Sequence, residues 1–141
     1  MNKTILIQDF MVSNPKFVRD TDSLYEAYQI MRLYNIRHLP VVDKDDRLVG
    51  VFTHTDLNKC YPPKENDASW FYDKDELSAM LVGKHMTREP AVLIPQDTLR
   101  EAALTMARGK YACIPIISPE TKKLAGIITY IDVLKKVADL V

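Results

Sequence analysis

The sequence predicts a mixed α/β (α+β) fold made of two copies of one β-α-β-β-α unit. The chain matches itself when it is shifted by 75 residues. Each copy also contains an amphipathic helix that begins with a capping sequence, and two short apolar runs separated by a polar turn. At 141 residues the chain is long enough to bury a sizeable core without disulfides or metals. We expect a first repeat at 1–60, a connector with a short helix at 61–82 and a second repeat at 83–141.

The internal repeat runs through most of both copies. The shift of 75 residues continues to the polar turn that follows the first apolar run, and beyond that turn the shift is 76. A single insertion confined to a polar turn is what two copies of one fold should show. The matched pairs include Met11 and Met86, Pro15 and Pro90, Leu24 and Leu99, Met31 and Met106, Pro40 and Pro115, Gly50 and Gly126, Thr53 and Thr129, and Asp56 and Asp132.

Each copy is expected to open with a short strand and then a helix. The strands are predicted around residues 17–18 and 92–93. The helix in "DSLYEAYQIM" places apolar residues on one face, and Ser23 with Glu26 has the spacing of a capping box. "DTLREAALTM" repeats this pattern, with Thr98 and Glu101 in the capping positions.

Two apolar runs and a second helix complete each copy. The runs are "HLPVV" and "LVGVF" in the first copy, and "CIPII" and "LAGII" in the second. Their β-branched residues favour buried strands, and the proline stands near the strand start, where it is tolerated. Thr53 and Thr129 then open helices over "THTDLNKC" and "TYIDVLKKV".

The segment between the copies matches neither of them. Pro62 and Pro63 are expected to break the preceding helix, and "KDELSAMLV" predicts a short helix that leads into the second copy. Trp70, Phe71 and Tyr72 are expected to pack against the two copies, with a partner or lid surface as the alternative.

Composition excludes several classes of function. The formal net charge is zero, with 19 basic and 19 acidic residues, so bulk charge draws the chain neither to nucleic acid nor to a membrane. No apolar run approaches the length of a membrane span. Cys60 and Cys113 have no metal-ligand or C-x-x-C spacing; we expect buried free thiols, with a disulfide or redox switch as the alternative. These features predict a soluble, cytoplasmic protein that binds neither nucleic acid nor membrane.

The Thr-x-x-Asp element at the start of each second helix has two interpretations. An ionised aspartate only accepts hydrogen bonds, which suits the two donors of a ribose diol, and a helix N-terminus with a threonine suits a phosphate. The same spacing is also close to a capping box, in which threonine and aspartate satisfy each other's backbone N–H groups. Both interpretations stay open at this point, because duplication would copy a cap and a binding site alike.

Taken together, these features resemble the CBS domain, named after cystathionine β-synthase, in its tandem form. The resemblance rests on "IQDFM" and "VGKHMT" at the copy starts, the "SLYEA" and "TLREA" helices, "RHLPVVD", "CIPII", and the stretches "GVFTHTDL" and "GIITYIDV". The order and spacing of these pieces, present twice, carry the likeness over nearly the whole chain. The long connector is most similar to stand-alone CBS pairs of the acetoin-utilisation type.

The resemblance implies a non-catalytic regulatory module. Two repeats of this family pack through their sheets around a pseudo-two-fold axis and leave two clefts. Many members bind adenine nucleotides or related adenosyl compounds there, so the expected regulatory ligand is AMP, ADP, ATP or S-adenosylmethionine. For this chain we expect no obligatory cofactor, no metal and no catalytic residue. The resemblance further implies a homodimer and a regulated enzyme or transporter as partner. The alternative function is a dimerisation or scaffold module with unoccupied clefts.

The resemblance also assigns roles to residues of this chain. The aspartates would accept from ribose hydroxyls, the threonines would meet ribose or phosphate, and each Leu-Pro or Ile-Pro pair would line the base. The first copy is the more basic of the two, and Ile131 replaces the hydroxyl of Thr55 in the second, so which cleft is occupied stays open. The candidate ligand-binding residues are Lys16, Phe17, Arg37, His38, Leu39, Pro40, Thr53, His54, Thr55, Asp56, Ala91, Val92, Cys113, Ile114, Pro115, Thr129, Tyr130 and Asp132.

Overall fold

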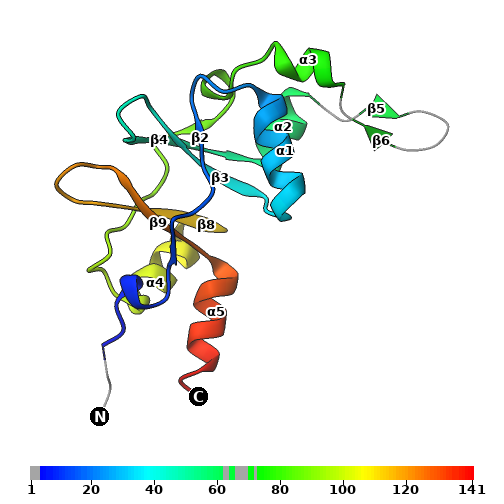
Figure 1. Cartoon of the computed structure of the whole chain (residues 1–141). Helices are drawn as coiled ribbons and strands as arrows, with labels where there is room; N and C mark the ends of the chain where they lie inside the picture. The colour runs from blue at the N-terminus through cyan, green and yellow to red at the C-terminus, as the bar shows by residue number, and fades with distance from the viewer. Residues whose placement is uncertain (1–3, 62–63, 66–69, 72) are drawn as a thin grey trace. The chain divides into compact units, whose positions relative to one another are not determined.

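The computed structural model describes residues 4–61, 64–65, 70–71 and 73–141, with the backbone alone described at 64–65 and 70–71 (Figure 1). The chain divides into two compact units. Lys16–Glu89 form one, which we call the first-copy unit, and Met1–Pro15 with Pro90–Val141 form the other, the second-copy unit. Each unit therefore combines the body of one sequence copy with the short opening segment of the other copy.

The first-copy unit contains a four-stranded sheet with helices packed on it. Its strand order is β2-β3-β4-β7, in which β2 runs parallel to β3 and the other neighbours are antiparallel. The α1·α2, α1·α3 and α1·β3 contacts hold the helices together against this sheet. The elements are β2 (Val18–Arg19), α1 (Leu24–Tyr34), β3 (His38–Val42), β4 (Leu48–Thr53), α2 (His54–Cys60), β5 (Lys64–Glu65), β6 (Trp70–Phe71), α3 (Lys74–Ser78), η2 (Val82–Lys84) and β7 (Thr87–Arg88).

The second-copy unit repeats this plan with one strand fewer. Its sheet has the order β1-β9-β8, and both pairings are antiparallel. The opening strand expected at residues 92–93 is reduced to one parallel bridge, between Leu93 and Ile116. The elements are η1 (Ile7–Asp9), β1 (Val12–Ser13), α4 (Leu99–Gly109), β8 (Cys113–Ile117), β9 (Leu124–Thr129) and α5 (Tyr130–Ala138).

Matched backbone details confirm that both units use the same local chemistry. Ser23 caps α1 by accepting from the Glu26 N–H at 3.1 Å, and Thr98 caps α4 by accepting from the Glu101 N–H at 3.1 Å. The left-handed residues also come in pairs at the two shifts of the repeat, and such conformations end helices or tighten turns. These pairs are Asn14 and Glu89, Asn35 and Lys110, and Asp46 and Lys122.

Glu26 and Glu101 do not complete the capping boxes that their spacing predicted. Glu26 lies beside Asp22, and burial together with this carboxylate raises the pKa of Glu26. A hydrogen bond with Asp97 likewise raises the pKa of Glu101. In both helices the serine or threonine hydroxyl supplies the cap, and the glutamate turns to the aspartate that precedes it.

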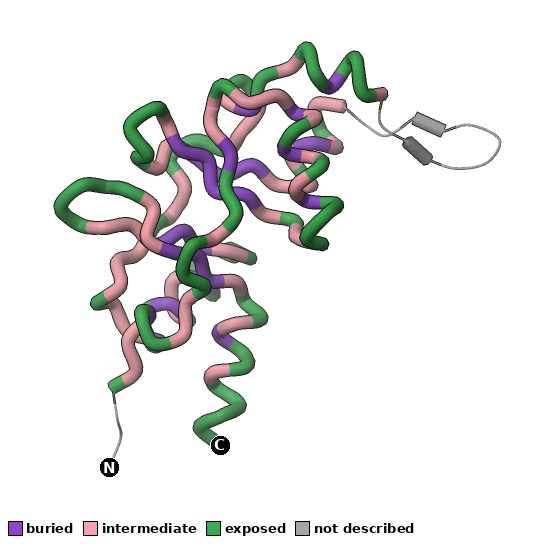
Figure 2. The backbone as a smooth tube through the Cα atoms, in the orientation of Figure 1, coloured by how far each residue is buried: buried purple, intermediate pink, exposed green. Residues whose placement is uncertain are grey.

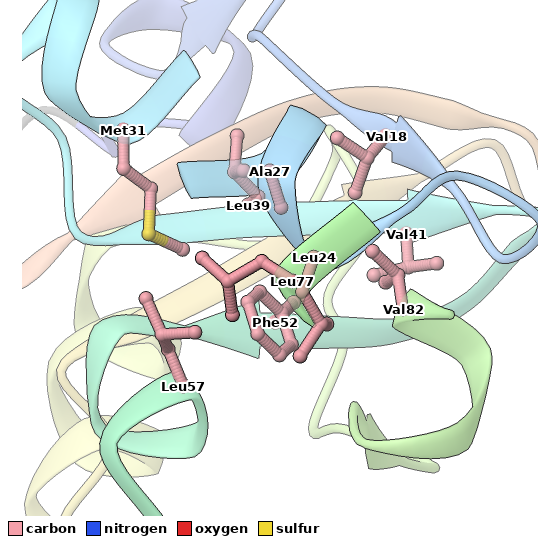
Figure 3. Packing of buried hydrophobic residues seen from close by; sticks show 10 residues of the cluster. All are labelled: Val18, Leu24, Ala27, Met31, Leu39, Val41, Phe52, Leu57, Leu77 and Val82. Atoms are coloured by element: carbon pink, nitrogen blue, oxygen red, sulfur yellow. The ribbon is translucent and has the colours of Figure 1, made fainter. Parts of the chain in front are cut away.

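Each core forms between the sheet and its helices. Figure 3 shows ten side chains of the first-copy core converging from β2, α1, β3, β4, α2, α3 and η2 around the ring of Phe52. The second-copy core gathers Ile7, Leu99, Ala102, Met106, Ile114, Ile116, Ile128 and Val133. In Figure 2 the buried stretches follow the central strands and one side of each helix, as expected for helices that cover a sheet face.

Several predictions meet a different outcome or lie outside the described residues. Cys60 and Cys113 are free thiols, as predicted, but both are only half-buried. Burial raises the pKa of each thiol. Pro62, Pro63 and Tyr72 lie outside the described residues, as do the side chains of Trp70 and Phe71, so the predicted helix break and aromatic packing stay predictions.

Candidate functional site

The predicted site residues of the first copy gather where β4 passes into α2. His38, at the start of β3, lies opposite Thr53 at the end of β4, and the His54 N–H donates to the Arg37 carbonyl at 3.0 Å. The parallel strand β2 begins with Val18 opposite Val41, so Lys16 and Phe17, which precede it, lie toward the end of the sheet at which β3 begins. We call this group the Asp56 half-site; its members are Lys16, Phe17, Arg37, His38, Thr53, His54, Thr55 and Asp56.

The second copy builds the same junction where β9 passes into α5. Cys113 lies opposite Thr129, and the Tyr130 N–H donates to the Ala112 carbonyl at 3.0 Å. The Leu93 N–H donates to the Pro115 carbonyl at 3.3 Å, which brings the residues before Leu93 to the same edge. We call this group the Asp132 half-site; its members are Ala91, Val92, Cys113, Thr129, Tyr130 and Asp132.

The four residues expected to line an adenine base have little exposed surface. Leu39 and Ile114 are both 0% exposed and belong to the cores of their units. Pro40 and Pro115 follow them on the strands and are also buried. Since successive side chains of a strand point to opposite faces, each proline lies on the sheet face opposite the helix-side core. Leu39 and Ile114 thus lie on the helix-side face of their sheets, and Pro40 and Pro115 lie on the opposite face.

Both Thr-x-x-Asp elements form capping boxes. The Asp56 N–H donates to Thr53 Oγ1 at 3.0 Å, and the Thr53 N–H donates to Asp56 Oδ2 at 3.0 Å. In the second copy the Asp132 N–H donates to Thr129 Oγ1 at 3.4 Å, and the Thr129 N–H donates to Asp132 Oδ2 at 2.8 Å. The capping interpretation is therefore confirmed in both copies.

Capping leaves each carboxylate with acceptor capacity to spare. An ionised carboxylate has about four acceptor positions, and the reciprocal cap bond from the threonine N–H uses one of them. The cap also holds the aspartate in one rotamer at the helix start, half-buried and still partly open to solvent. A pre-oriented acceptor of this kind suits a ligand with neighbouring hydroxyl donors, such as a ribose.

The positive charge of the Asp56 half-site comes from Arg37 and Lys16. Burial lowers the pKa of His38, and the nearby Arg37 guanidinium lowers it further. The same two causes lower the pKa of His54. Both shifts favour the neutral form of the imidazole, and His54 Nδ1 lies 3.2 Å from the Asn58 amide nitrogen. Lys16 Nζ lies 4.3 Å from the centre of the Tyr34 ring, which still leaves its charge at the exposed edge.

The Asp132 half-site has a more apolar surface. Burial raises the pKa of the Cys113 thiol to about 12, so this side chain is uncharged at neutral pH. Tyr130, at the start of α5, and Val92, just before the bridge between Leu93 and Ile116, are 49% and 37% exposed and give this half-site aromatic and aliphatic surface. The two half-sites thus share their backbone and their aspartate but differ in charge.

One residue at the Asp56 half-site was not predicted from the sequence. Thr87, in β7, directs its hydroxyl to the Asp56 carboxylate, with Oγ1 3.2 Å from both Oδ1 and Oδ2. Thr87 belongs to the start of the second sequence copy, and only the pairing of β7 with β4 of the first copy brings it to Asp56. A signal for Thr87 was present in the repeat. The shift of 75 residues matches Thr87 with Val12, so a polar residue in one copy corresponds to an apolar residue in the other.

The described part of the chain lacks two other functional features, a metal-binding cluster and a membrane-spanning helix. Within it, histidine, cysteine, aspartate and glutamate side chains nowhere gather in threes in a way that could hold a metal ion. Among the helices of residues 4–61 and 73–141, none combines the length and the hydrophobicity that a bilayer crossing demands.

Comparison with known proteins identifies a repeated domain. The profile of the CBS domain matches residues 7–62 and 82–139, which together make up most of the chain. Among curated proteins, the inosine-5'-monophosphate dehydrogenase of Aquifex aeolicus is 32% identical over 127 residues, which are 89% of this chain and 23% of the enzyme. The chain thus spans about a quarter of the length of this enzyme and of two further curated relatives.

Solved structures match over nearly the whole chain. The acetoin utilization protein AcuB of Vibrio cholerae is 26% identical, with a TM-score of 0.79 over 99% of this chain and 96% of its own. CBSX2, solved with AMP, is 23% identical, with a TM-score of 0.75 over 96% and 98%. The CBS pair of MJ0100, solved with 5'-methylthioadenosine and S-adenosylmethionine, is 22% identical, with a TM-score of 0.77 over 99% and 100%. The last two likenesses establish the fold alone.

Proposed function

Because the chain belongs to the CBS domain family, we propose that it is a non-catalytic regulatory module that binds an adenosine-containing ligand at the Asp56 and Asp132 half-sites. The observation that carries the proposal is the aspartate of each half-site. A capping box orients it at a helix N-terminus, and acceptor capacity remains for a ribose diol.

The proposed ligand class is supported by what related proteins hold. CBSX2 was solved with AMP, and the MJ0100 pair with two adenosyl compounds that lack phosphate. Adenosine is the part common to all three ligands. In this chain the exposed Arg37 and Lys16 make the Asp56 half-site suitable for an anionic ligand such as AMP, ADP or ATP. S-adenosylmethionine is the alternative that fits the less charged Asp132 half-site.

The regulated partner in this proposal is an enzyme or transporter of the cytoplasm. The match to inosine-5'-monophosphate dehydrogenase covers only 23% of that enzyme, so the CBS pair there is one part of a longer chain. A module that matches this part is suited to report ligand occupancy to a catalytic partner rather than to catalyse a reaction itself. Balanced charge and the lack of a basic patch in the sequence argue against nucleic acid as the partner.

Thermal unfolding with and without ligand tests the proposal. At a ligand concentration of one hundred times the dissociation constant, binding stabilises the folded state by about 2.7 kcal/mol. For a chain of this size we expect Tm to rise by roughly 5–10 °C. The panel is AMP, ADP, ATP, S-adenosylmethionine and NAD at millimolar concentration, with inorganic phosphate as the control for non-specific anion effects. A panel without any shift would instead support an unliganded scaffold.

We further propose that the module is a homodimer whose subunits meet through α5. Tyr130, Ile131, Leu134 and Val137 leave 40–62% of their surface exposed along this helix. The residues at the same positions of α2 and its C-cap are His54, Thr55, Asn58 and Tyr61. The apolar surface is thus greater on one of two helices that share a fold position, and burial against a second copy would remove it from water.

Light scattering coupled to size-exclusion chromatography tests this dimer. The wild-type protein is expected to scatter at twice the 16.2 kDa of one chain. Leu134→Glu is expected to weaken the dimer at least tenfold, since it buries an unpaired charge. Lys135→Glu, on the adjoining polar side of α5, is the matched control and should leave the dimer in place. A monomeric wild-type protein, or a dimer that tolerates Leu134→Glu, would contradict the proposed interface.

A further inference from the structure

The two half-sites differ in what their aspartate already binds. Thr87 of β7 lies opposite Val51 of β4, and its hydroxyl reaches the Asp56 carboxylate. Val12 of β1 occupies the corresponding position opposite Ile127 of β9. A valine has nearly the shape of threonine but no donor, so Asp132 receives no such bond from β1.

The position of the Thr87 hydroxyl determines whether a ligand can reach the Asp56 carboxylate. Its oxygen is 3.2 Å from both Asp56 Oδ1 and Oδ2, so it lies between the two oxygens at equal distance. A vicinal diol that donates one hydrogen bond to each oxygen of a carboxylate approaches from the same side. Thr87 and a ribose therefore require the same space in front of Asp56.

The corresponding side of the Asp132 carboxylate has no threonine hydroxyl from β1. Its Oδ2 accepts from the Thr129 N–H at 2.8 Å and from Thr129 Oγ1 at 3.1 Å. Its Oδ1 accepts from no residue in the described part of the chain. The second-copy carboxylate therefore already binds two donors of its own helix cap on one oxygen and leaves the other for a ligand.

We propose that the Thr87 hydroxyl competes with the ribose diol for the Asp56 carboxylate, so that the Asp56 half-site recognises ribose more weakly than the Asp132 half-site. This inference rests on the function proposed above and assigns β7 a regulatory part in it. To bind ribose, the Asp56 half-site must first release the Thr87 hydroxyl. A shift of β7 along β4 would release it too, so the affinity of this half-site depends on how firmly β7 is paired.

Exchange of the two residues isolates this effect. Thr87→Val gives β7 the residue of β1, and Val12→Thr gives β1 the residue of β7. Both positions are exposed, and each new side chain is already present at the matched position of the other unit, so both variants are expected to fold. The loss of one hydroxyl competitor at a half-buried carboxylate should tighten binding roughly three- to tenfold.

The experiment uses the full chain with two probes, AMP and adenosine, titrated in a calorimeter or followed by NMR. Adenosine carries the ribose without the phosphate and so removes the contribution of Arg37 and Lys16. We expect Thr87→Val to tighten the Asp56-dependent site and Val12→Thr to weaken the Asp132-dependent site by a similar factor. Asp56→Asn and Asp132→Asn in each background assign the two sites.

The possible outcomes separate this inference from the proposed function. If wild-type protein binds neither probe at millimolar concentration, both the proposed function and the competition are wrong. If both probes bind but Thr87→Val leaves the Asp56-dependent affinity unchanged or lowers it, the competition alone is wrong. A reduced affinity would mean that Thr87 orients the carboxylate for the ligand instead of blocking it.

Discussion

Phe52→Ala is expected to lower the free energy of unfolding by about 3–5 kcal/mol. Phe52 is 0% exposed and is the largest fully buried side chain among the described residues. Its ring lies amid side chains from the sheet and helices of the first-copy unit (Figure 3). Truncation leaves a cavity, because the surrounding elements are packed against one another and cannot all move in to fill it. Chemical denaturation followed by circular dichroism measures this loss.

The control for Phe52→Ala is Leu33→Ala on α1. Leu33 is 75% exposed, and its truncation removes little buried area. We expect the free energy of unfolding to change by less than about 0.5 kcal/mol at this position. Equal losses for the two variants would contradict the placement of the first-copy core.

Gly50→Ala is expected to destabilise the protein by about 1–3 kcal/mol and to displace β7. A Cβ at Gly50 would lie 2.7 Å from the Thr87 carbonyl oxygen and 2.7 Å from Met86 Sδ. The Met86 side chain can rotate away, but the carbonyl belongs to the strand that pairs with β4. The strand must therefore move, and Thr87 should lose its hydrogen bonds to Asp56.

Two other glycines test whether backbone contact is the cause. A Cβ at Gly126 would lie 2.9 Å from the Val12 carbonyl oxygen, so Gly126→Ala should destabilise the second-copy unit in the same way. A Cβ at Gly109 would meet the exposed Tyr111 ring, which can move, and alanine favours the helix. Gly109→Ala should therefore be neutral or stabilising. Denaturation midpoints that rank the three variants otherwise would contradict this account.

Much of the fold could be predicted because its signals are local. Hydrophobic periodicity and Ser23 or Thr98 at the helix starts indicated α1 and α4, and the β-branched runs indicated β3, β4, β8 and β9. The internal repeat then transferred each assignment from one copy to the other. The family could be named on the same grounds, because order and spacing are properties of the sequence.

The rest depends on tertiary pairing. The strands β1 and β7 have two residues each, too few for a periodic pattern, and each pairs with a strand of the other sequence copy. The approach of Thr87 to Asp56 follows from that pairing and has no local signal. Similarly, alternation along β3 and β8 could show that Leu39 and Pro40 face opposite ways, but only the packed core shows that Leu39 is fully buried.

For the Thr-x-x-Asp elements the sequence left two interpretations open, helix capping and ligand binding, and the two are compatible. Both form capping boxes, so capping explains their presence at helix starts. The cap also fixes the aspartate in the orientation that ribose recognition would need, which makes the two roles compatible. Separating them requires a substitution that keeps the cap and removes the diol acceptor.

Affinity for AMP of the double variant Asp56→Asn, Asp132→Asn is the most direct test of the central claim. At the N3 position of a capping box the asparagine side-chain oxygen can still accept from the N–H of the N-cap threonine, as glutamine does in place of glutamate, so the free energy of unfolding should change little. Its amide, however, replaces one carboxylate oxygen with a donor, which cannot accept from a ribose hydroxyl. We predict wild-type stability with AMP affinity reduced at least thirtyfold. Unchanged affinity in the stable double variant would show that the aspartates are caps alone.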